Sequence, residues 1–366
     1  MTRPLEIKQP FNLELSLMMG QAFRWRKLPM DFYGDGHQWF SGVLGDNLIH
    51  IHQVGGLNGP VEYRIGGPRG KCDADDKHDE MLRRYFREDD DVEAMQQDLM
   101  CKDAHIAAVI NQHRGLRLIR QDPWVCLVTY ILSAVAQVER MDSNVESIAT
   151  LNPQMLRLGC DQRHVFPTAT QVVAAGEERL SKLGLIGLPA FPSRIYAAAS
   201  RIESGILKLN DLQHADYARA RNELKECDGI GDKIADCIAL FSLDKLEAFP
   251  VDTHIRKALA AWPDCPTRSY QATANWARDY FGPYAGYAGQ FLFRDQRTGK
   301  GDDVNTQRLR EQENQPVGER QPAESVSRYP NRAYACPTCG ATVGISCRYP
   351  SGYYYSKGHS ARGPRA

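Results

Sequence analysis

The chain has 366 residues with 45 basic and 45 acidic side chains, so its formal net charge is zero. This length predicts two or three domains with a sizeable core, and the balanced charge neither indicates nor excludes a nucleic-acid-binding face. The longest apolar run, Trp124–Ala136, is too short to cross a bilayer, and no N-terminal segment is typical of secretion, so we expect a cytoplasmic protein without a membrane partner.

The N-terminal part of the chain has the pattern of strands. Segments 38–44 and 47–51 alternate in polarity and are separated by a Gly-Asp turn, which is typical of an antiparallel hairpin. We therefore predict an antiparallel sheet domain over residues 1–100. From Asp79 onward helical periodicity takes over, and it predicts a helical domain over residues 101–297.

Two acidic segments indicate helix starts. Asp122 is suited to an N-cap and Pro123 to the first helical position, so the apolar run that follows is interpreted as a buried helix. Three adjacent acids at 89–91 precede another helical pattern. We interpret them as a solvated helix N-terminus rather than as a metal site.

The cysteines do not indicate a redox cofactor. Seven of the ten are scattered through the globular part of the chain without a pattern, which is typical of reduced thiols. A close four-cysteine cluster is absent from the sequence, so an iron–sulfur cluster is not expected.

The sequence around Gly229-Ile230-Gly231 predicts a helix-hairpin-helix. Helical patterns over 217–225 and 233–243 flank these residues, and two glycines allow a tight turn between the helices. The backbone N–H groups that open the second helix then have no intrahelical partner, and such groups bind phosphate well. We predict that Gly229 and Gly231 contact a DNA backbone.

Lys233 and Asp252 make this segment a candidate active site. Lys233 lies in the first turn of the second helix, where the helix dipole and exclusion of water favour a neutral, nucleophilic amine. Asp252 precedes another helical pattern over 253–261, and its carboxylate could stabilise a cationic sugar while a glycosidic bond breaks. Taken singly, Lys233 is more often a solvated helix lysine and Asp252 more often a simple N-cap, but their joint occurrence around this hairpin favours chemistry.

Four stretches of the chain resemble one enzyme family. They are DGIGDKIADCIALFSLDKLEAFPVDTH at 228–254, GQAFRW at 20–25, RLIRQDPWVCL at 117–127 and FGPYAGYAGQFLF at 281–293. In this order they resemble the helix-hairpin-helix DNA glycosylases, and in particular the 8-oxoguanine DNA glycosylase/lyase family. The resemblance implies an α+β fold, with an antiparallel sheet domain packed on a mostly helical glycosylase core.

The resemblance also implies roles for individual residues. The carbonyl of Gly20 would accept a hydrogen bond from N7–H of the oxidised guanine. Cys237 and Phe241 would line the base pocket, although core packing is the alternative for both. His254 would contact a phosphate or, alternatively, be a surface or capping residue. Gln296 is the nearest candidate for the glutamine that reads the Watson–Crick edge of the base.

Other positions match or depart from the family around the opposite base. Arg140 matches an arginine that reads the opposite cytosine, and Phe191 matches an aromatic wedge. Residues 135–137 are Val-Ala-Gln where the family has asparagines, and Pro192 stands where a second arginine is expected. Valine and alanine cannot hydrogen-bond a cytosine edge, so the opposite-base preference and the lesion are left open.

The C-terminal part has a different composition. Residues 298–330 are polar and broken by prolines, which predicts a flexible linker. Residues 331–366 are too short to fold on a hydrophobic core, and we predict a structural zinc module. Its ligands would be Cys336, Cys339, Cys347 and His359. Interleaved basic and aromatic side chains favour a nucleic-acid tether over a protein-interaction module.

Together these features predict a bifunctional DNA glycosylase and abasic-site lyase of base excision repair. The expected partner is double-stranded DNA with a damaged base, 8-oxoguanine above all, and the expected state is a nucleoid-associated monomer. Two alternatives stay open: a glycosylase for another modified base, given Val135 and Pro192, and a DNA-binding protein that no longer cuts.

Overall fold

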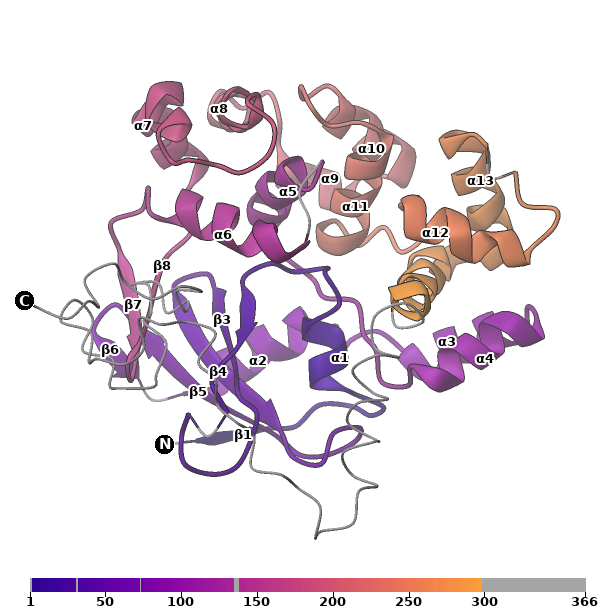
Figure 1. Cartoon of the computed structure of the whole chain (residues 1–366), viewed down its shortest axis with the longest axis horizontal. Helices are drawn as coiled ribbons and strands as arrows, with labels where there is room; N and C mark the ends of the chain where they lie inside the picture. Colours follow the sequence, from indigo (N-terminus) through magenta and orange to yellow (C-terminus); the bar gives the residue numbers. More distant parts are fainter. Residues whose placement is uncertain (1, 31, 73, 135–137, 267, 298–366) are drawn as a thin grey trace, which may run out of the picture.

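The structure is a computed structural model that describes every residue except 1, 31, 73, 135–137, 267 and 298–366. An N-terminal antiparallel sheet packs against a larger group of helices (Figure 1). The predicted α+β fold class is therefore confirmed for the described residues. Among them, no helix combines the length and the apolar character that a membrane crossing requires.

The sheet has six strands in the order β1-β5-β4-β3-β2, with the short β6 paired to β5. All neighbouring strands are antiparallel, and the expected hairpin is formed by β3 and β4 with Leu44 opposite Asn47. The strands are β1 (Arg3–Leu5), β2 (Trp25–Lys27), β3 (Phe40–Leu44), β4 (Asn47–Gln53), β5 (Val61–Gly67) and β6 (Gly70–Cys72).

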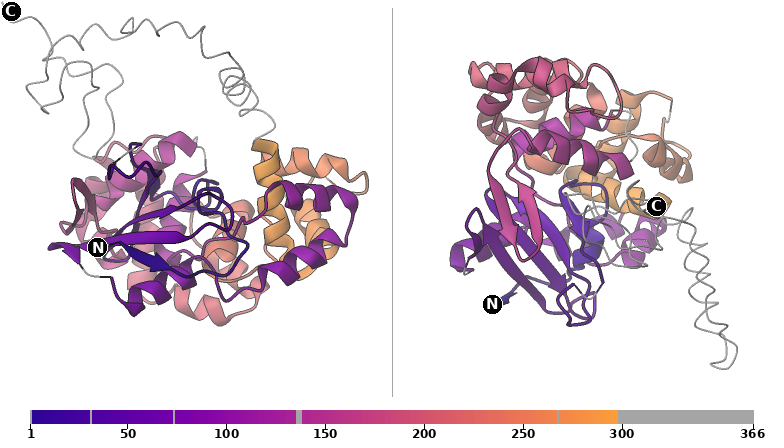
Figure 2. Two further views of the ribbon diagram at one scale, coloured as in Figure 1. Left: turned by 90° about the horizontal axis from the view of Figure 1, so that it is seen from below. Right: turned by 60° about the vertical axis from the view of Figure 1, so that its left-hand side comes forward.

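Each face of the sheet is covered by a different element. On one face, Ile49, Ile51 and Tyr63 pack with apolar residues of α1 (Leu13–Leu17) and α2 (Asp76–Tyr85). On the other face, Val43 and Leu48 pack against a second hairpin, β7 (Met155–Leu158) and β8 (Asp161–His164), which lies along the sheet (Figure 2).

The hairpin β7–β8 corrects one prediction. Helical periodicity was expected without interruption beyond Asp79, but these two strands occur in the middle of the helical part. A four-residue strand with a single buried face has too few apolar positions to separate a period of two from a helical period. Its place on the sheet also means that both parts of the molecule contribute to the sheet's core.

The remaining helices form the larger domain. They are α3 (Val92–Met100), α4 (Ala104–Gln112), α5 (Pro123–Leu132), α6 (Val138–Ala149), α7 (Ala169–Ser181), α8 (Phe191–Glu203), α9 (Leu209–His214), α10 (Tyr217–Lys225), α11 (Asp232–Ser242), α12 (Thr253–Ala258) and α13 (Tyr270–Phe281). Short 3-10 turns follow at Leu259–Ala261 and Gly282–Tyr284, and residues 285–297 form a last helix. Asp122 caps α5 through Val125 N and Pro123 is its first residue, as predicted.

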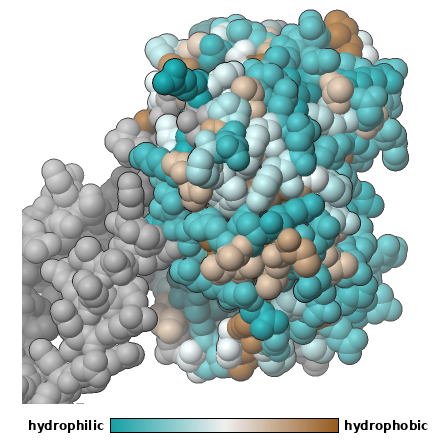
Figure 3. Space-filling view, turned by 90° about the vertical axis from the view of Figure 1, so that its right-hand side faces the viewer, coloured by the Kyte–Doolittle hydropathy of each residue, from teal (hydrophilic) through white to brown (hydrophobic). Residues whose placement is uncertain are grey.

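Helix α11 lies at the centre of this domain. Its residues from Ile234 to Ser242 are all buried, and it packs against α5 on one side and α10 on the other. By contrast, the face formed by α3, α4, α12 and α13 is largely hydrophilic, with apolar residues only in small groups (Figure 3). The apolar side chains of α13 instead point into the core, as Ala274, Ala277 and Phe281 show.

Candidate active site

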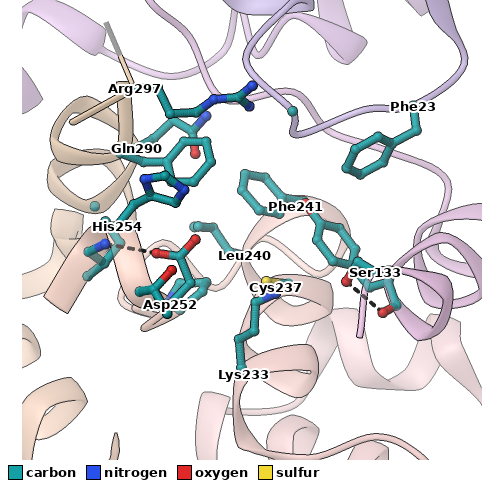
Figure 4. Close-up of a pocket in the computed structure, with 18 of the residues that line it drawn as sticks. Phe23, Ser133, Lys233, Cys237, Leu240, Phe241, Asp252, His254, Gln290 and Arg297 are labelled. Carbon is teal, nitrogen blue, oxygen red and sulfur yellow. Dashed lines mark hydrogen bonds between the residues drawn. The ribbon is translucent and has the colours of Figure 1, made fainter. Parts of the chain in front are cut away.

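A cavity of about 920 Å³ opens between the two domains. Its walls come from α5, α6, α11, α12, the last helix and the stretch that begins at Gly20. The volume is within the range of sites that enclose a small organic ligand. Figure 4 shows side chains from these distant segments pointing into the same space.

The helix-hairpin-helix turn positions α11 at this cavity. Gly229 has a φ of +82°, and a Cβ atom added there would lie 2.4 Å from Cδ of Arg194, so only glycine fits. Gly231 is the N-cap of α11 and has no side-chain capping bond. The backbone N–H groups at this helix start are therefore arranged as a phosphate site requires.

Lys233 and Asp252 both line the cavity (Figure 4). Lys233 lies in the first turn of α11, and its side chain is partly shielded from solvent. Asp252 is the N-cap of α12, where its Oδ1 accepts a hydrogen bond from Ile255 N at 2.8 Å. Because this cap fixes the carboxylate, Asp252 faces the cavity in one orientation. The two groups that the sequence singled out therefore share one site.

Cys237 lies one turn beyond Lys233 on the same helix, and it is 4% exposed. Burial raises the pKa of Cys237 to about 12, although the positive charge of Lys233 acts to lower it. The sulfur is therefore a neutral thiol at physiological pH, and it offers the cavity a polarisable apolar surface rather than a nucleophile.

Aromatic rings form the wall beside Cys237. Phe241 of α11 stacks on Tyr130 of α5, with ring centroids 5.6 Å apart and an interplanar angle of 4°. Phe23 meets Tyr130 edge to face at 6.1 Å. Rings in this arrangement give a flat, apolar surface suited to a planar base.

The last helix supplies polar groups to the opposite side of the cavity. Gln290 is 6% exposed, and its amide nitrogen is buried without a hydrogen-bond partner among the described residues. His254 meets the ring of Phe293 edge to face at 5.6 Å, and the guanidinium of Arg297 lies 5.6 Å from the same ring. A buried, unpaired amide is costly, so Gln290 is placed to bind a polar ligand.

The structure brings six of the predicted site residues together in this cavity. Those that line the cavity are Gly20, Lys233, Cys237, Phe241, Asp252 and His254. Four residues that the sequence did not single out also line it: Phe23, Gln290, Phe293 and Arg297. Phe23 lies in GQAFRW, and Gln290 and Phe293 lie in FGPYAGYAGQFLF, so the signal for three of them was present in stretches already recognised.

Two predicted residues lie elsewhere. Gln296 is not part of the cavity wall, because it is almost two turns further along the last helix than Gln290. Phe191 has no exposed surface, since its ring packs beneath Gly187, where an added Cβ would lie 2.3 Å away. An exposed wedge at Phe191 is therefore wrong, and the large apolar side chain that this turn exposes is Ile186.

The described part of the chain does not include several residues that the sequence singled out. These are Val135, Ala136, Gln137, the side chain of Arg140, the linker, and the predicted zinc ligands Cys336, Cys339, Cys347 and His359. Pro192 is buried in the first turn of α8. In the described part of the chain, no group of three or more histidine, cysteine or acidic residues is arranged to hold a metal ion.

Residues 5–127 match the family model described as the 8-oxoguanine DNA glycosylase N-terminal domain. An N-glycosylase/DNA lyase of Arabidopsis thaliana is 28% identical over 292 residues, which cover 77% of this chain and 76% of that protein. The chain is therefore similar to the 8-oxoguanine DNA glycosylase family. An N-glycosylase/DNA lyase of Saccharomyces cerevisiae is 25% identical over 282 residues, 71% of this chain and 68% of the yeast protein.

Solved structures of similar fold extend the comparison to 82% of the chain. The 8-oxoguanine glycosylase/lyase of Clostridium acetobutylicum, in complex with double-stranded DNA, superposes with a TM-score of 0.71 at 22% identity, covering 82% of this chain and 99% of that one. A 3-methyladenine DNA glycosylase from Archaeoglobus fulgidus gives a TM-score of 0.61 at 17% identity, with coverages of 82% and 99%. At these identities the likeness shows a shared fold.

Proposed function

We propose that this protein is a bifunctional DNA glycosylase and abasic-site lyase of base excision repair, which removes 8-oxoguanine from double-stranded DNA. The observation that carries the proposal is the shared cavity of Lys233 and Asp252 at the end of a helix-hairpin-helix. The names of the relatives, N-glycosylase/DNA lyase in both cases, support the same chemistry.

The reaction follows from these two side chains. The Nζ atom of Lys233 forms a bond to C1′ of the extruded nucleotide while the N-glycosidic bond breaks and its electron pair leaves with the base. The carboxylate of Asp252 stabilises the positive charge that develops on the sugar. Loss of the amine proton and ring opening give a Schiff base between Lys233 and C1′.

Strand cleavage then follows by β-elimination. A proton leaves C2′, the C3′–O bond breaks, and the 3′ phosphate departs with that electron pair. Water finally adds to the Schiff base and releases Lys233 for another turnover. The backbone N–H groups after Gly231 would hold a phosphate of the duplex while the nucleotide is extruded.

Recognition of the base is assigned to the other walls. The rings of Phe23 and Phe241 and the sulfur of Cys237 would enclose the planar base. The carbonyl of Gly20 would accept the N7–H that distinguishes 8-oxoguanine from guanine. The unpaired amide of Gln290 would hydrogen-bond a polar edge of the base.

Borohydride trapping tests the proposal. Incubation of the protein with duplexes that carry 8-oxoguanine or an abasic site should give a covalent adduct, because borohydride reduces the Schiff base to a stable amine. Lys233→Gln should abolish the adduct, whereas Lys257→Gln should leave it unchanged, since Lys257 is exposed on α12 and does not line the cavity. An undiminished adduct in Lys233→Gln would exclude the mechanism.

Two alternatives are separated from the proposal by further measurements. Duplexes with different lesions, each opposite all four bases, would reveal a glycosylase for another modified base, which Val135 and Pro192 leave open. Binding of these duplexes without any trapped adduct would indicate a DNA-binding protein that no longer cuts.

We further infer that residues 331–366 bind a structural zinc ion through Cys336, Cys339, Cys347 and His359 and tether the enzyme to DNA. A DNA tether and a DNA substrate together favour a protein that resides with the nucleoid, and we expect it to be a monomer. Metal analysis of the full chain should find one zinc ion, which Cys339→Ser should release. If that variant loses zinc but keeps its affinity for DNA, a protein-interaction role is favoured.

A further inference from the structure

A buried carboxylate lies directly behind the catalytic helix face. Asp236 is one turn beyond Lys233 on α11, and it has no exposed surface. Its Oδ1 accepts hydrogen bonds from the hydroxyl of Tyr217 at 2.7 Å and from Nε of Arg221 at 2.9 Å, both on α10. Its Oδ2 accepts a hydrogen bond from the hydroxyl of Tyr270, on α13, at 2.6 Å. One carboxylate thus connects three helices.

Tyr270 extends this connection to the other catalytic residue. Besides donating to Asp236, its hydroxyl oxygen accepts a hydrogen bond from Val251 N at 3.4 Å. Val251 directly precedes Asp252, in the short non-helical segment between Pro250 and the start of α12. The phenol oxygen therefore lies between the carboxylate on the helix of Lys233 and the backbone beside Asp252.

The protonation states suit this arrangement. Burial raises the pKa of Tyr270, and the neighbouring charge of Asp236 raises it further, so the phenol stays protonated and donates to the carboxylate. Burial also raises the pKa of Asp236, while the hydrogen bonds from Tyr217, Tyr270 and Arg221 oppose that effect. A carboxylate this deeply buried is held in one orientation by its donors, because any movement would leave an unpaired polar atom.

We propose that Asp236 and Tyr270 are positioning residues, which fix the Asp252 carboxylate relative to the Lys233 amine through the hydrogen bond to Val251 N. This inference rests on the proposed glycosylase/lyase function. Neither residue lines the cavity, so neither would contact the extruded nucleotide. They act through geometry, and a displacement of about 1 Å at reacting groups can cost about a hundredfold in rate.

Tyr217 provides a matched control within the same cluster. Tyr217→Phe and Tyr270→Phe each remove one phenol oxygen from the same carboxylate, but only the second also removes the acceptor for Val251 N. A purely structural cluster would respond alike to both changes. A positioning role predicts a difference between them in the chemical step.

The test is single-turnover excision of 8-oxoguanine by the full chain, with duplex affinity and thermal stability measured alongside. We expect Tyr270→Phe to lower the rate constant about tenfold with unchanged affinity, and Tyr217→Phe to lower it less than about twofold. In an Asp252→Asn background, Tyr270→Phe should have almost no further effect, because the group that it positions is already disabled. Equal slowing by both phenylalanine variants, or additive losses in the double variant, would overturn the proposal.

A measurement on the unmodified chain covers the case in which Tyr270→Phe does not fold. The amide hydrogen of Val251 should exchange with solvent more slowly than that of the exposed Thr253, and exchange at an equal rate would also overturn the proposal. The outcomes stay separate from those of the proposed function. An unmodified chain without excision activity refutes the function, whereas an active one with identical tyrosine variants refutes only the positioning role.

Discussion

The two sides of the cavity are built in contrasting ways. One side, with Lys233, Cys237 and Asp252, comes from a short contiguous part of the chain, α11 and the start of α12. The other side comes from segments far apart in the sequence, the stretch from Gly20 to Phe23 and the last helix. In the proposed reaction, the first side carries the reacting groups and the second encloses the base.

The bonds that hold the two sides differ in the same way. Asp252 is held by Ile255, three residues away. The stretch beside Gly20 is held by the buried Gln21, whose amide nitrogen donates to the carbonyl of Arg117 at 2.9 Å and whose amide oxygen accepts from Ile119 N at 3.0 Å. A capping bond such as that of Asp252 forms within one short segment. The hydrogen bonds of Gln21 join residues about 100 positions apart, so the second side forms only when both domains are assembled. Changes on the first side should therefore affect chemistry, and changes on the second should affect stability and recognition.

Asp252→Asn should have the largest effect and should leave the fold intact. Asparagine keeps the oxygen that caps α12 but removes the negative charge, so the stability should change little while the chemical step slows about 10²- to 10³-fold. Single-turnover excision and thermal unfolding of the same preparation measure both quantities. A large loss of stability would mean that Asp252 is chiefly a cap, and the contrast between the two sides would fail.

Glu146→Gln tests the assembled side. Glu146 of α6 pairs with Arg24 at 3.0 Å and with Arg163 of β8 at 2.5 Å, and thereby joins the stretch after Phe23 to the helical domain. Removing its charge deprives two buried guanidinium groups of the countercharge of Glu146, which should lower the free energy of unfolding by about 3 kcal/mol. Glu178→Gln, which breaks an exposed pair with Lys182, is the control and should cost less than about 0.5 kcal/mol.

The same variant has a definite pH dependence. Burial alone would raise the pKa of Glu146, but the charges of Arg163 and Arg24 outweigh burial and hold the pKa well below its usual range. A carboxyl with a lowered pKa stabilises the fold above its unfolded pKa and loses that contribution as the pH falls. Denaturant unfolding between about pH 6 and pH 2 should therefore show a smaller acid loss in Glu146→Gln than in the unmodified chain.

The contrast between the two sides also explains what the sequence could predict. Lys233 and Asp252 were found because turn glycines, helix starts and caps are local signals, whereas the role of Cys237 came from the family resemblance. Gln296 was chosen in place of Gln290 because the sequence does not say which face of the last helix meets the other domain. Phe191 was misplaced because its burial beneath Gly187 depends on the path of one turn.

The fold shows the same limit. The hairpin β3–β4 and the capped start of α5 were predicted correctly, since their turn and cap residues are adjacent in sequence. The hairpin β7–β8 was missed because its apolar residues, Leu156 and Leu158, are explained only by contact with Val43 and Leu48 on the sheet.

Gln290→Ala tests the side of the cavity that is proposed to enclose the base, and its effect on excision should be of intermediate size. If Gln290 binds the base, its loss should reduce excision of 8-oxoguanine about 10- to 30-fold, as expected for one buried hydrogen bond to a ligand. Gln296→Ala is the matched control and should retain full activity, because Gln296 is outside the cavity. Equal activity of the two variants would remove Gln290 from the proposed recognition site.

Asp142→Asn should change the free energy of unfolding least, and it should raise that free energy where Glu146→Gln lowers it. Asp142 lies one turn before Glu146 on α6, but burial raises the pKa of Asp142 to about 7. The positive charges of Arg163 and Arg26 act to lower this pKa, and the negative charge of Glu146 acts to raise it. A carboxyl with a raised pKa favours the fold while protonated, and this contribution is lost as the pH rises from about 4 to about 7. Asparagine stays neutral throughout, so Asp142→Asn should match the unmodified chain near pH 4 and exceed its stability by about 1 kcal/mol near pH 8. Chemical denaturation at both pH values measures the difference, with the exposed Asp264→Asn as control. Lower stability of Asp142→Asn at pH 8 would mean that the charged carboxylate of Asp142 stabilises the fold beside Arg163. Asp142 and Glu146 would then both stabilise the fold in their charged forms.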